Sequence, residues 1–434
     1  MWIYLIAYIV ILVIIGIFDS FKVKTFDDYT VAGRNKKWVS VFFSFVASCI
    51  GASTTIGIVN LSYDIGFPVV WWLLSGGICL TILGIFFADK IQAGGYYTLS
   101  DFAGRKAGGS VGKIIALIIL LSWLGIIAAQ FVAASKILDL FFDVPFNSIL
   151  ICVVVGICVY TYLGGQLSVL RTDILQGNLI IFTVIFLAAI LFAKDTSCVD
   201  FSDIVFVNQS FTFKKVIFFF LVIGSTYFIG PDIFSRIFTA KTGKDAKIAC
   251  ILAGMVLAVI SFFIVFIGVW AKKKSFSGDS ILLNIIVSFV DKRFSWIFIL
   301  GILSAVISSA DTCLLTMCAI VEKDISMGKR LNAARQTVFV VGGLALCLAL
   351  WKQDIVVLLM SAYKIFSAGV IPLITVILIA GRNFKIKEFF AAIAVLAGGI
   401  FGVLAVAFSY DIFIVYGMII TFSLTLIGLK RNTE

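Results

Sequence analysis

The stretch that decides the fold is "VSVFFSFVASCIGASTTIGIVNL", residues Val39 to Leu61. It is apolar enough to cross a membrane, but Gly51 and the small hydroxyl residues after it interrupt the run at mid-length. Such residues let a helix unwind inside a membrane where neighbouring groups or water satisfy the freed backbone. The sequence therefore predicts a transmembrane helix that is broken near its centre.

A second stretch has the same irregularity. It reads "VIFFFLVIGSTYFIGPDIFSR", Val216 to Arg236, with Gly224-Ser225-Thr226 in its middle and Gly230-Pro231 near its inner end. Two broken helices that lie five spans apart are typical of an inverted five-helix repeat, in which binding sites lie at the bilayer midplane. The alternative is that glycine and serine only permit close helix packing.

The composition indicates a polytopic membrane protein that is all α-helical. The 434 residues are 62% hydrophobic and 13% charged, whereas soluble domains are nearer half apolar and about a quarter charged. The net charge of +11 is spread over short loops, so we expect no nucleic-acid partner. We expect the first apolar run to be a span and not a signal peptide. The chain has no histidine, which excludes Ser-His-Asp triads and histidine metal sites, and we expect no enzymatic activity.

The apolar runs predict about thirteen spans, since a helix needs about 20 residues to cross the bilayer. The expected spans are 2–18, 38–61, 67–88, 113–141, 146–163, 173–193, 214–231, 246–271, 295–321, 335–351, 354–380, 387–408 and 411–429. Residues 1–434 then form one transmembrane domain. It consists of an extra helix 2–18, a first inverted repeat 38–193, a second repeat 214–380 and two C-terminal helices within 387–429.

The positive-inside rule sets the orientation. With the N-terminus outside, most lysine and arginine residues lie on the cytoplasmic side, Arg236 among them, and "KKK" at 272–274 is the main exception. We therefore expect an external N-terminus and a cytoplasmic C-terminus in a cell membrane, the bacterial inner membrane.

The run "AVISSADTCLL", Ala305 to Leu315, carries a stripe of oxygen on an apolar helix. Its members at i, i+3 and i+4 share one face, and they are Ser308, Asp311 and Thr312, with Ser309 beside them. If this helix packs against the first break, the two serine hydroxyls face carbonyls released around Ala47 and Ile50. Neutral oxygens suit a hard monovalent cation. The alternative is that these hydroxyls bond to their own helix.

Four stretches, in this order and spacing, resemble the sodium/solute symporter family. They are "DDYTVAGR" (27–34), "VYTYLGGQLSVLRTDILQ" (159–176), "GPDIFSRIFTAK" (230–241) and "AVISSADTCLL" (305–315). The resemblance covers about residues 25 to 380. It implies a LeuT-like core, as in the proline, pantothenate, sugar and sialic-acid carriers.

The resemblance also implies ion sites. The sodium ligands would be the carbonyls of Ala47, Ile50 and Ala305 and the hydroxyls of Ser308 and Ser309. Asp173 would help to couple or release sodium. Together with Asp311 and Thr312 it could hold a second cation, or the two carboxylates could share a proton.

Residues near the two breaks are candidates for the solute site. They are Ser53, Thr54, Trp71, Gln130, Ser225, Thr226 and Tyr227. Lys364 joins them because an intramembrane charge marks a functional site by default, and we expect it to face the cavity and to meet a substrate carboxylate or a partner aspartate. The alternative is that Lys364 snorkels or faces a wet vestibule. Thr54 stands where the sugar carriers have glutamine, so a sugar substrate is not supported. Cys49 stands where the proline carrier has aspartate, so proline-type coupling through that residue is absent.

The function that the resemblance implies is secondary active transport. Sodium would drive a small organic solute into the cell by alternating access, with the lipid bilayer as the surrounding partner and the oligomeric state left open. The alternatives are a proton-coupled or uncoupled carrier on the same fold and a non-transporting membrane sensor. The short tail "LIGLKRNTE" disfavours the sensor.

Overall fold

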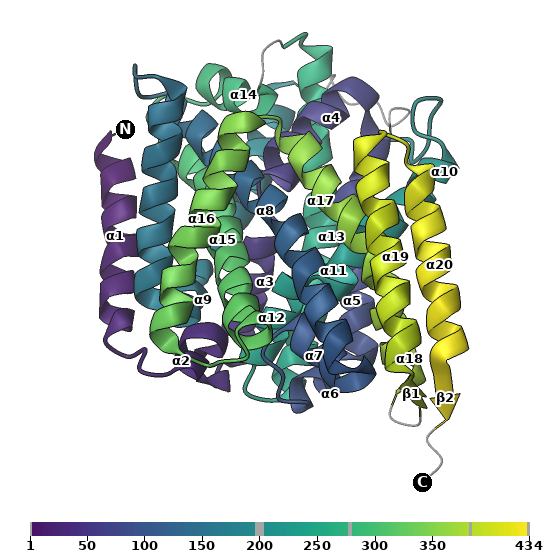
Figure 1. Cartoon of the computed structure of the whole chain (residues 1–434). Helices are drawn as coiled ribbons and strands as arrows, with labels where there is room; N and C mark the ends of the chain where they lie inside the picture. Colours follow the sequence, from purple (N-terminus) through teal and green to yellow (C-terminus); the bar gives the residue numbers. More distant parts are fainter. Residues whose placement is uncertain (1, 196–203, 277–279, 382–383, 432–434) are drawn as a thin grey trace.

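The computed structural model describes residues 2–195, 204–276, 280–381 and 384–431 (Figure 1). Almost all of this is helical. The strands in the described part are β1 (Phe384–Ile386) and β2 (Leu429–Arg431), which form one antiparallel pair. Helix α1 begins near one end of the helical bundle, and β2 lies at the opposite end (Figure 1). The all-α prediction is confirmed.

Within the described residues, nine helical segments are long and apolar enough to cross a membrane, or eleven if each of two bent pairs is one span. The nine contain α1 (Trp2–Ser20), η3 (Phe67–Val70) with α5 (Trp71–Phe86), α8 (Gly109–Asp139), α9 (Phe146–Lys194), α10 (Phe213–Phe219) to α12 (Pro231–Thr239), α13 (Gly243–Lys273), α15 (Ser295–Ile320) with η7 (Val321–Ile325), α16 (Leu331–Trp351) and α19 (Glu388–Ala407). A shorter apolar helix is α20 (Ile412–Gly428). The expected thirteen spans and the inverted repeat stay predictions.

Helix α9 contains two of the expected spans. Its 49 residues are too many for one crossing at 1.5 Å per residue. The backbone leaves the helical region at Gly165, with φ 55° and ψ −156°, a conformation that suits glycine. The hydroxyls of Tyr160 and Thr172 lie 2.7 Å apart, although a continuous helix would separate these residues by about 18 Å. The chain therefore bends back at Gly165.

The broken second span is confirmed. Helix α3 (Trp38–Cys49) ends before a wide turn, η2 (Ser53–Gly57), that continues into α4 (Ile58–Ile65), and the two parts are bent by 57°. The hydroxyl of Thr54 accepts a hydrogen bond from the Gly51 N–H at 2.7 Å. The side-chain oxygen of Gln130 accepts one from the Ala52 N–H at 2.9 Å. Side chains thus replace the helical partners that the break removes.

The seventh span is less irregular than expected. A wide turn, η6 (Phe220–Gly224), precedes α11 (Ser225–Ile229), and Gly230 leaves the helical region with ψ 139° before α12 begins. Residues Phe213–Thr239 count as one span, whereas the two bent pairs of helices are each bent by more than 40°. The break therefore lies at Gly230, six residues after Gly224, because Pro231 has no N–H to continue the ladder.

The span expected over 354–380 is bent, by 46°, between α17 (Ile355–Gly369) and α18 (Ile371–Ala380). Pro372 has no N–H for the carbonyl four residues earlier. That carbonyl, of Ala368, accepts the hydroxyl of Thr421 on α20 at 3.0 Å instead.

Helix α15 is the centre of the bundle. Of the 18 most apolar consecutive residues of α15 with η7, 89% are buried. Helix α15 packs against α3, α8, α9 and α16. Helices α19 and α20 form one edge (Figure 1). Short helices lie near the end that carries β1 and β2, and they are α2 (Phe26–Val31), η1 (Ala32–Arg34), α6 (Ala88–Ala93) and α7 (Leu99–Ala107). Helix α14 (Ile281–Phe289) lies at the other end.

Candidate functional site

The oxygen stripe of α15 faces the break after α3. The hydroxyl of Ser309 is 3.0 Å from the Ser48 carbonyl and 2.9 Å from the Ala305 carbonyl. The N–H groups of Gly51 and Ala52 bond to side chains, so the carbonyls of Ala47 and Ser48 lack their usual helical partners. The break and the stripe therefore meet at Ser309, which contacts the Ser48 carbonyl and also its own helix; the expected contacts with Ala47 and Ile50 stay predictions.

Gly51 permits this close approach. A Cβ atom at this position would lie 2.6 Å from the Ser309 hydroxyl oxygen and 3.0 Å from the side-chain nitrogen of Gln130. Any larger residue would push the break and α15 apart. The glycine is needed here for space and not for an unusual backbone angle.

Asp173, on the second arm of α9, joins the same site. Its Oδ1 accepts the Ser308 hydroxyl at 2.6 Å, and its Oδ2 accepts the Ser44 hydroxyl at 2.5 Å. Asp173 and Ser308 have no exposed surface. Three helices, α3, α9 and α15, therefore meet at one buried carboxylate.

Arg236 is an unexpected member of the site. Charge counting did not predict that its side chain is completely buried; the cytoplasmic position of its segment stays a prediction. The guanidinium donates to the hydroxyl of Thr312 and lies 3.9 Å from Asp173 Oδ2. Asp311 Oδ1 is 3.4 Å from the Thr312 hydroxyl, and Asp311 Oδ2 has no hydrogen-bond partner among the described residues. A fixed cation thus borders the expected second cation position, which stays a prediction.

A central cavity lies beside the break, between α8, α11, α12, α15 and α17. Four residues expected at the solute site line it, and they are Ser53, Gln130, Thr226 and Tyr227. Sequence reasoning missed several others, which are Trp123, Asp232, Cys313 and Tyr363. Asp232 carried a signal that could have identified it, an acidic residue directly after Gly-Pro inside an apolar run.

Three expected solute ligands are used elsewhere. The hydroxyl of Thr54 bonds to the backbone of the break. The indole N–H of Trp71 donates to the Phe206 carbonyl at 2.9 Å, and the hydroxyl of Ser225 donates to the Leu221 carbonyl of its own helix. None of the three lines the central cavity, so the structure does not bring them together with the other residues expected at the solute site.

Lys364 also lies outside the cavity lining. Its ammonium is 2.7 Å from Asp411 Oδ1, at the start of α20, and the two side chains are 18% and 54% exposed. Lys364 therefore has an aspartate partner, and the structure does not bring it to the central cavity. Helix α17 turns this residue towards the C-terminal helix pair.

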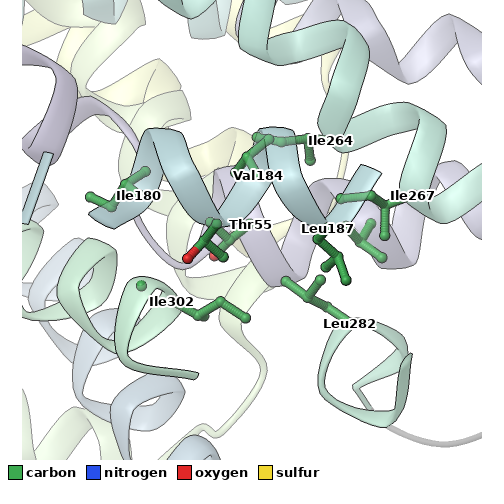
Figure 2. A pocket seen from close by; sticks show the side chains of 11 residues that line it. Thr55, Ile180, Val184, Leu187, Ile264, Ile267, Leu282 and Ile302 are labelled. Carbon is green, nitrogen blue, oxygen red and sulfur yellow. The ribbon is translucent and has the colours of Figure 1, made fainter. Parts of the chain in front are cut away.

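A second cavity lies next to the break but is apolar. Figure 2 shows Thr55 among Ile180, Val184, Leu187 and other aliphatic side chains. The Thr55 hydroxyl donates to the Gly51 carbonyl at 2.8 Å. This cavity offers no charged group to a solute, so the central cavity is the better candidate.

The end of the bundle near α2, α6 and α7 is held by a polar contact. The Tyr97 hydroxyl lies 2.8 Å and 2.9 Å from the two carboxylate oxygens of Asp27, and the Lys329 ammonium donates to it at 2.9 Å. A small cavity lined by Tyr97, Pro231 and Ser235 lies between this contact and α12. The contact thus joins three segments that lie far apart in the sequence.

Buried oxygen ligands at a helix break in a bundle of apolar spans define a class, the ion-coupled membrane transporters. The chain belongs to the sodium:solute symporter family, whose model matches residues 29–385. Sodium is accordingly its coupling ion, and it is a multi-pass membrane transporter of a small solute and not an enzyme. The resemblance drawn from the four stretches is confirmed.

The relatives are distant. The human high affinity choline transporter 1 is 23% identical over 427 residues, 87% of this chain and 73% of the relative. The sodium/pantothenate symporter of Haemophilus influenzae is 22% identical, over 79% of this chain and 72% of the relative. The match to the sodium/glucose cotransporter of Vibrio parahaemolyticus covers 35% of this chain and 28% of the relative.

Solved structures agree on the fold. A sodium-coupled sialic acid symporter in a substrate-bound outward-open state has a TM-score of 0.86 at 16% identity, and the match covers 100% of this chain and 99% of that one. The nucleobase-cation-symport-1 family transporter Mhp1, in a closed conformation, has a TM-score of 0.64 at 15% identity, over 92% and 93% of the two chains. The LeuT-like fold is therefore supported.

Proposed function

We propose that this protein carries a small organic solute into the cell together with sodium, by alternating access. The observation that carries the proposal is the position of the buried Ser309 hydroxyl, which lies at the break beside the Ser48 carbonyl and 2.9 Å from the Ala305 carbonyl. Carbonyl and hydroxyl oxygens are the ligands that a hard cation takes. Because they are neutral, they leave no charged site to be neutralised when the ion departs.

The sodium ligands in this proposal are five oxygens. They are the carbonyl oxygens of Ala47, Ile50 and Ala305 and the hydroxyl oxygens of Ser308 and Ser309. The donor set fits sodium, because the hydroxyls are buried and the Ala47 carbonyl lacks its helical partner. Asp173 accepts the Ser308 hydroxyl and would orient it towards the ion.

The solute would occupy the central cavity, which borders the same break. Ser309 lines this cavity and is also a proposed sodium ligand. Occupation of the ion site would therefore fix one wall of the solute site. This shared wall is a physical basis for coupling, because each ligand stabilises the packing that the other needs.

Alternating access requires that each end of the bundle can close. We assign the contact between Tyr97, Asp27 and Lys329 to the cytoplasmic end, with the N-terminus outside and the C-terminus inside.

The proposed architecture has thirteen spans, with both arms of α9 and α20 counted, and an inverted repeat of residues 38–193 and 214–380. At a membrane potential of 100 mV, one sodium ion supplies about 2.3 kcal/mol.

The test is the thermal stability of the purified protein with sodium chloride or potassium chloride. A ligand that binds the folded state raises its stability, so sodium should raise the melting temperature and potassium should not. Ser308→Ala/Ser309→Ala should abolish the sodium effect. Ser135→Ala is the matched control, because its buried hydroxyl donates only to its own helix, at 2.7 Å from the Phe131 carbonyl.

Two outcomes would contradict the proposal. A sodium effect that survives in the double serine variant would place the ion elsewhere. No sodium effect in the parent protein, together with a pH-dependent one, would favour a proton-coupled carrier that uses Asp173 and Asp311.

A further inference from the structure

We propose that the solute is an organic cation, recognised by Asp232 and by aromatic rings of the central cavity. This inference rests on the proposed function, because it names the class of solute for the same site. Four observations carry it: the position of one carboxylate, the lack of basic groups around it, the local charge balance and the aromatic lining.

Asp232 is the acidic residue in the lining of the central cavity. It lies in the first turn of α12, directly after the extended residue Gly230 and Pro231. Among the described residues, no lysine or arginine nitrogen lies within 4.0 Å of its carboxylate. The described lining also contains no lysine or arginine. A carboxylate solute would therefore meet a negative charge here and no positive one.

The buried Arg236 forms its hydrogen bonds and its ion pair with groups other than Asp232. Arg236, one helical turn further along α12, donates to Ser235 and to Thr312 and lies near Asp173. Asp173, Asp232 and Asp311 are therefore three carboxylates in the surroundings of this one guanidinium. Buried charges are normally paired. One sodium ion would offset part of this excess, and a cationic solute beside Asp232 would offset the rest.

Three aromatic rings line the same cavity from three different helices. They are Trp123 of α8, Tyr227 of α11 and Tyr363 of α17. The Tyr227 hydroxyl donates to the Cys49 carbonyl at 3.1 Å, which leaves its ring to border the cavity. A carboxylate among aromatic rings suits an ammonium group, which the ring faces attract. A carboxylic acid would instead place a second negative charge beside Asp232.

The experiment is a thermal-shift screen of the full chain in sodium chloride. The probes are choline, tetramethylammonium and ethanolamine, with 3,3-dimethylbutan-1-ol as the neutral isostere of choline and pantothenate as a carboxylate. We expect at least one cation to raise the melting temperature in sodium but not in potassium, and the isostere to leave it unchanged. Asp232→Asn should weaken binding of that cation at least tenfold and keep the sodium effect.

Two further variants keep the test decisive. Asp64→Asn, at an exposed position of α4, should bind the cation like the parent. If Asp232→Asn does not fold, Tyr363→Leu should weaken cation binding several-fold, and Tyr363→Phe should restore it.

The inference fails if no cation shifts the parent protein, or if the isostere or pantothenate binds better than every cation. In those cases an intact sodium effect would leave the proposed function standing. No sodium effect in the parent would overturn both.

Discussion

The substitution Gly51→Ala tests the close contact between the break and α15. The added methyl group would lie 2.6 Å from the Ser309 hydroxyl oxygen and 3.0 Å and 3.1 Å from the amide atoms of Gln130. Normal contact distances begin near 3.5 Å, so Ser309 must retreat by ~1 Å or the break must move. Either movement separates two of the proposed sodium ligands.

Two energies follow from this contact. Overpacking of a closely packed site costs ~1–3 kcal/mol of folding stability. For sodium, displacement of a ligand should raise the dissociation constant about tenfold. At a sodium concentration ten times the parent dissociation constant, stabilisation would fall from about 1.4 to about 0.4 kcal/mol.

The assay is a sodium titration followed by thermal unfolding, with Gly57→Ala as the matched control. Gly57 lies in the same segment, but an added Cβ there would be 3.7 Å from its nearest neighbours. The control should bind sodium like the parent and be as stable or slightly more stable, because alanine restricts the unfolded chain.

A double variant separates the two energies. Gly51→Ala/Ser309→Ala removes the clashing oxygen, so it should recover much of the stability lost in Gly51→Ala. It should not recover sodium binding, because the ligand itself is gone. The reasoning is refuted if Gly51→Ala folds and binds sodium with the parent affinity.

Three further predictions concern the surrounding charges and the inner end. Arg236→Gln should cost ~3–5 kcal/mol in unfolding experiments, because it leaves buried carboxylates without their counter-charge. The added change Asp311→Asn should recover part of that loss, and a single variant as stable as the parent would contradict the pairing. Lys364→Met should cost at most ~1 kcal/mol and keep sodium-dependent uptake, since its ion pair is partly exposed; loss of uptake would return it to the solute site. Tyr97→Phe should favour an inward-open state and so increase maleimide labelling of Ser235→Cys, whereas unchanged labelling would argue against a closing role.

The sequence was sufficient to predict the break and the hydroxyl stripe. Gly51 and the residues after it contradict the usual continuous apolar span, and Ser308 and Ser309 contradict the usual apolar helix face. Both are local departures from a strong pattern. Their meeting required a topology, which the resemblance to a family supplied.

The sequence was not sufficient to place individual charges. Arg236 stands at the end of an apolar run, where charge counting assigns it to a loop, but the break at Gly230 lets α12 carry it back among buried carboxylates. Lys364 stands in the middle of a run, where depth alone suggests a site. Which way it faces depends on the bend beyond Gly369 and on the C-terminal pair that carries Asp411. Side-chain direction at these positions is a tertiary property.

The choice of neutral ligands bears on how the transport cycle can proceed. The Ser309 hydroxyl can donate to the Ser48 or Ala305 carbonyl, or present its lone pairs to a cation, by rotation of one hydrogen. Its hydrogen-bonding capacity is therefore satisfied in both conditions, and release of the ion strands no buried group. A carboxylate in the same place would bind sodium more tightly but would need a new counter-charge after each release. In this chain the carboxylate is that of Asp173, which accepts a hydrogen bond from the Ser308 hydroxyl and lies near Arg236. A site of this design can both bind and release sodium under a driving force of only a few kcal/mol.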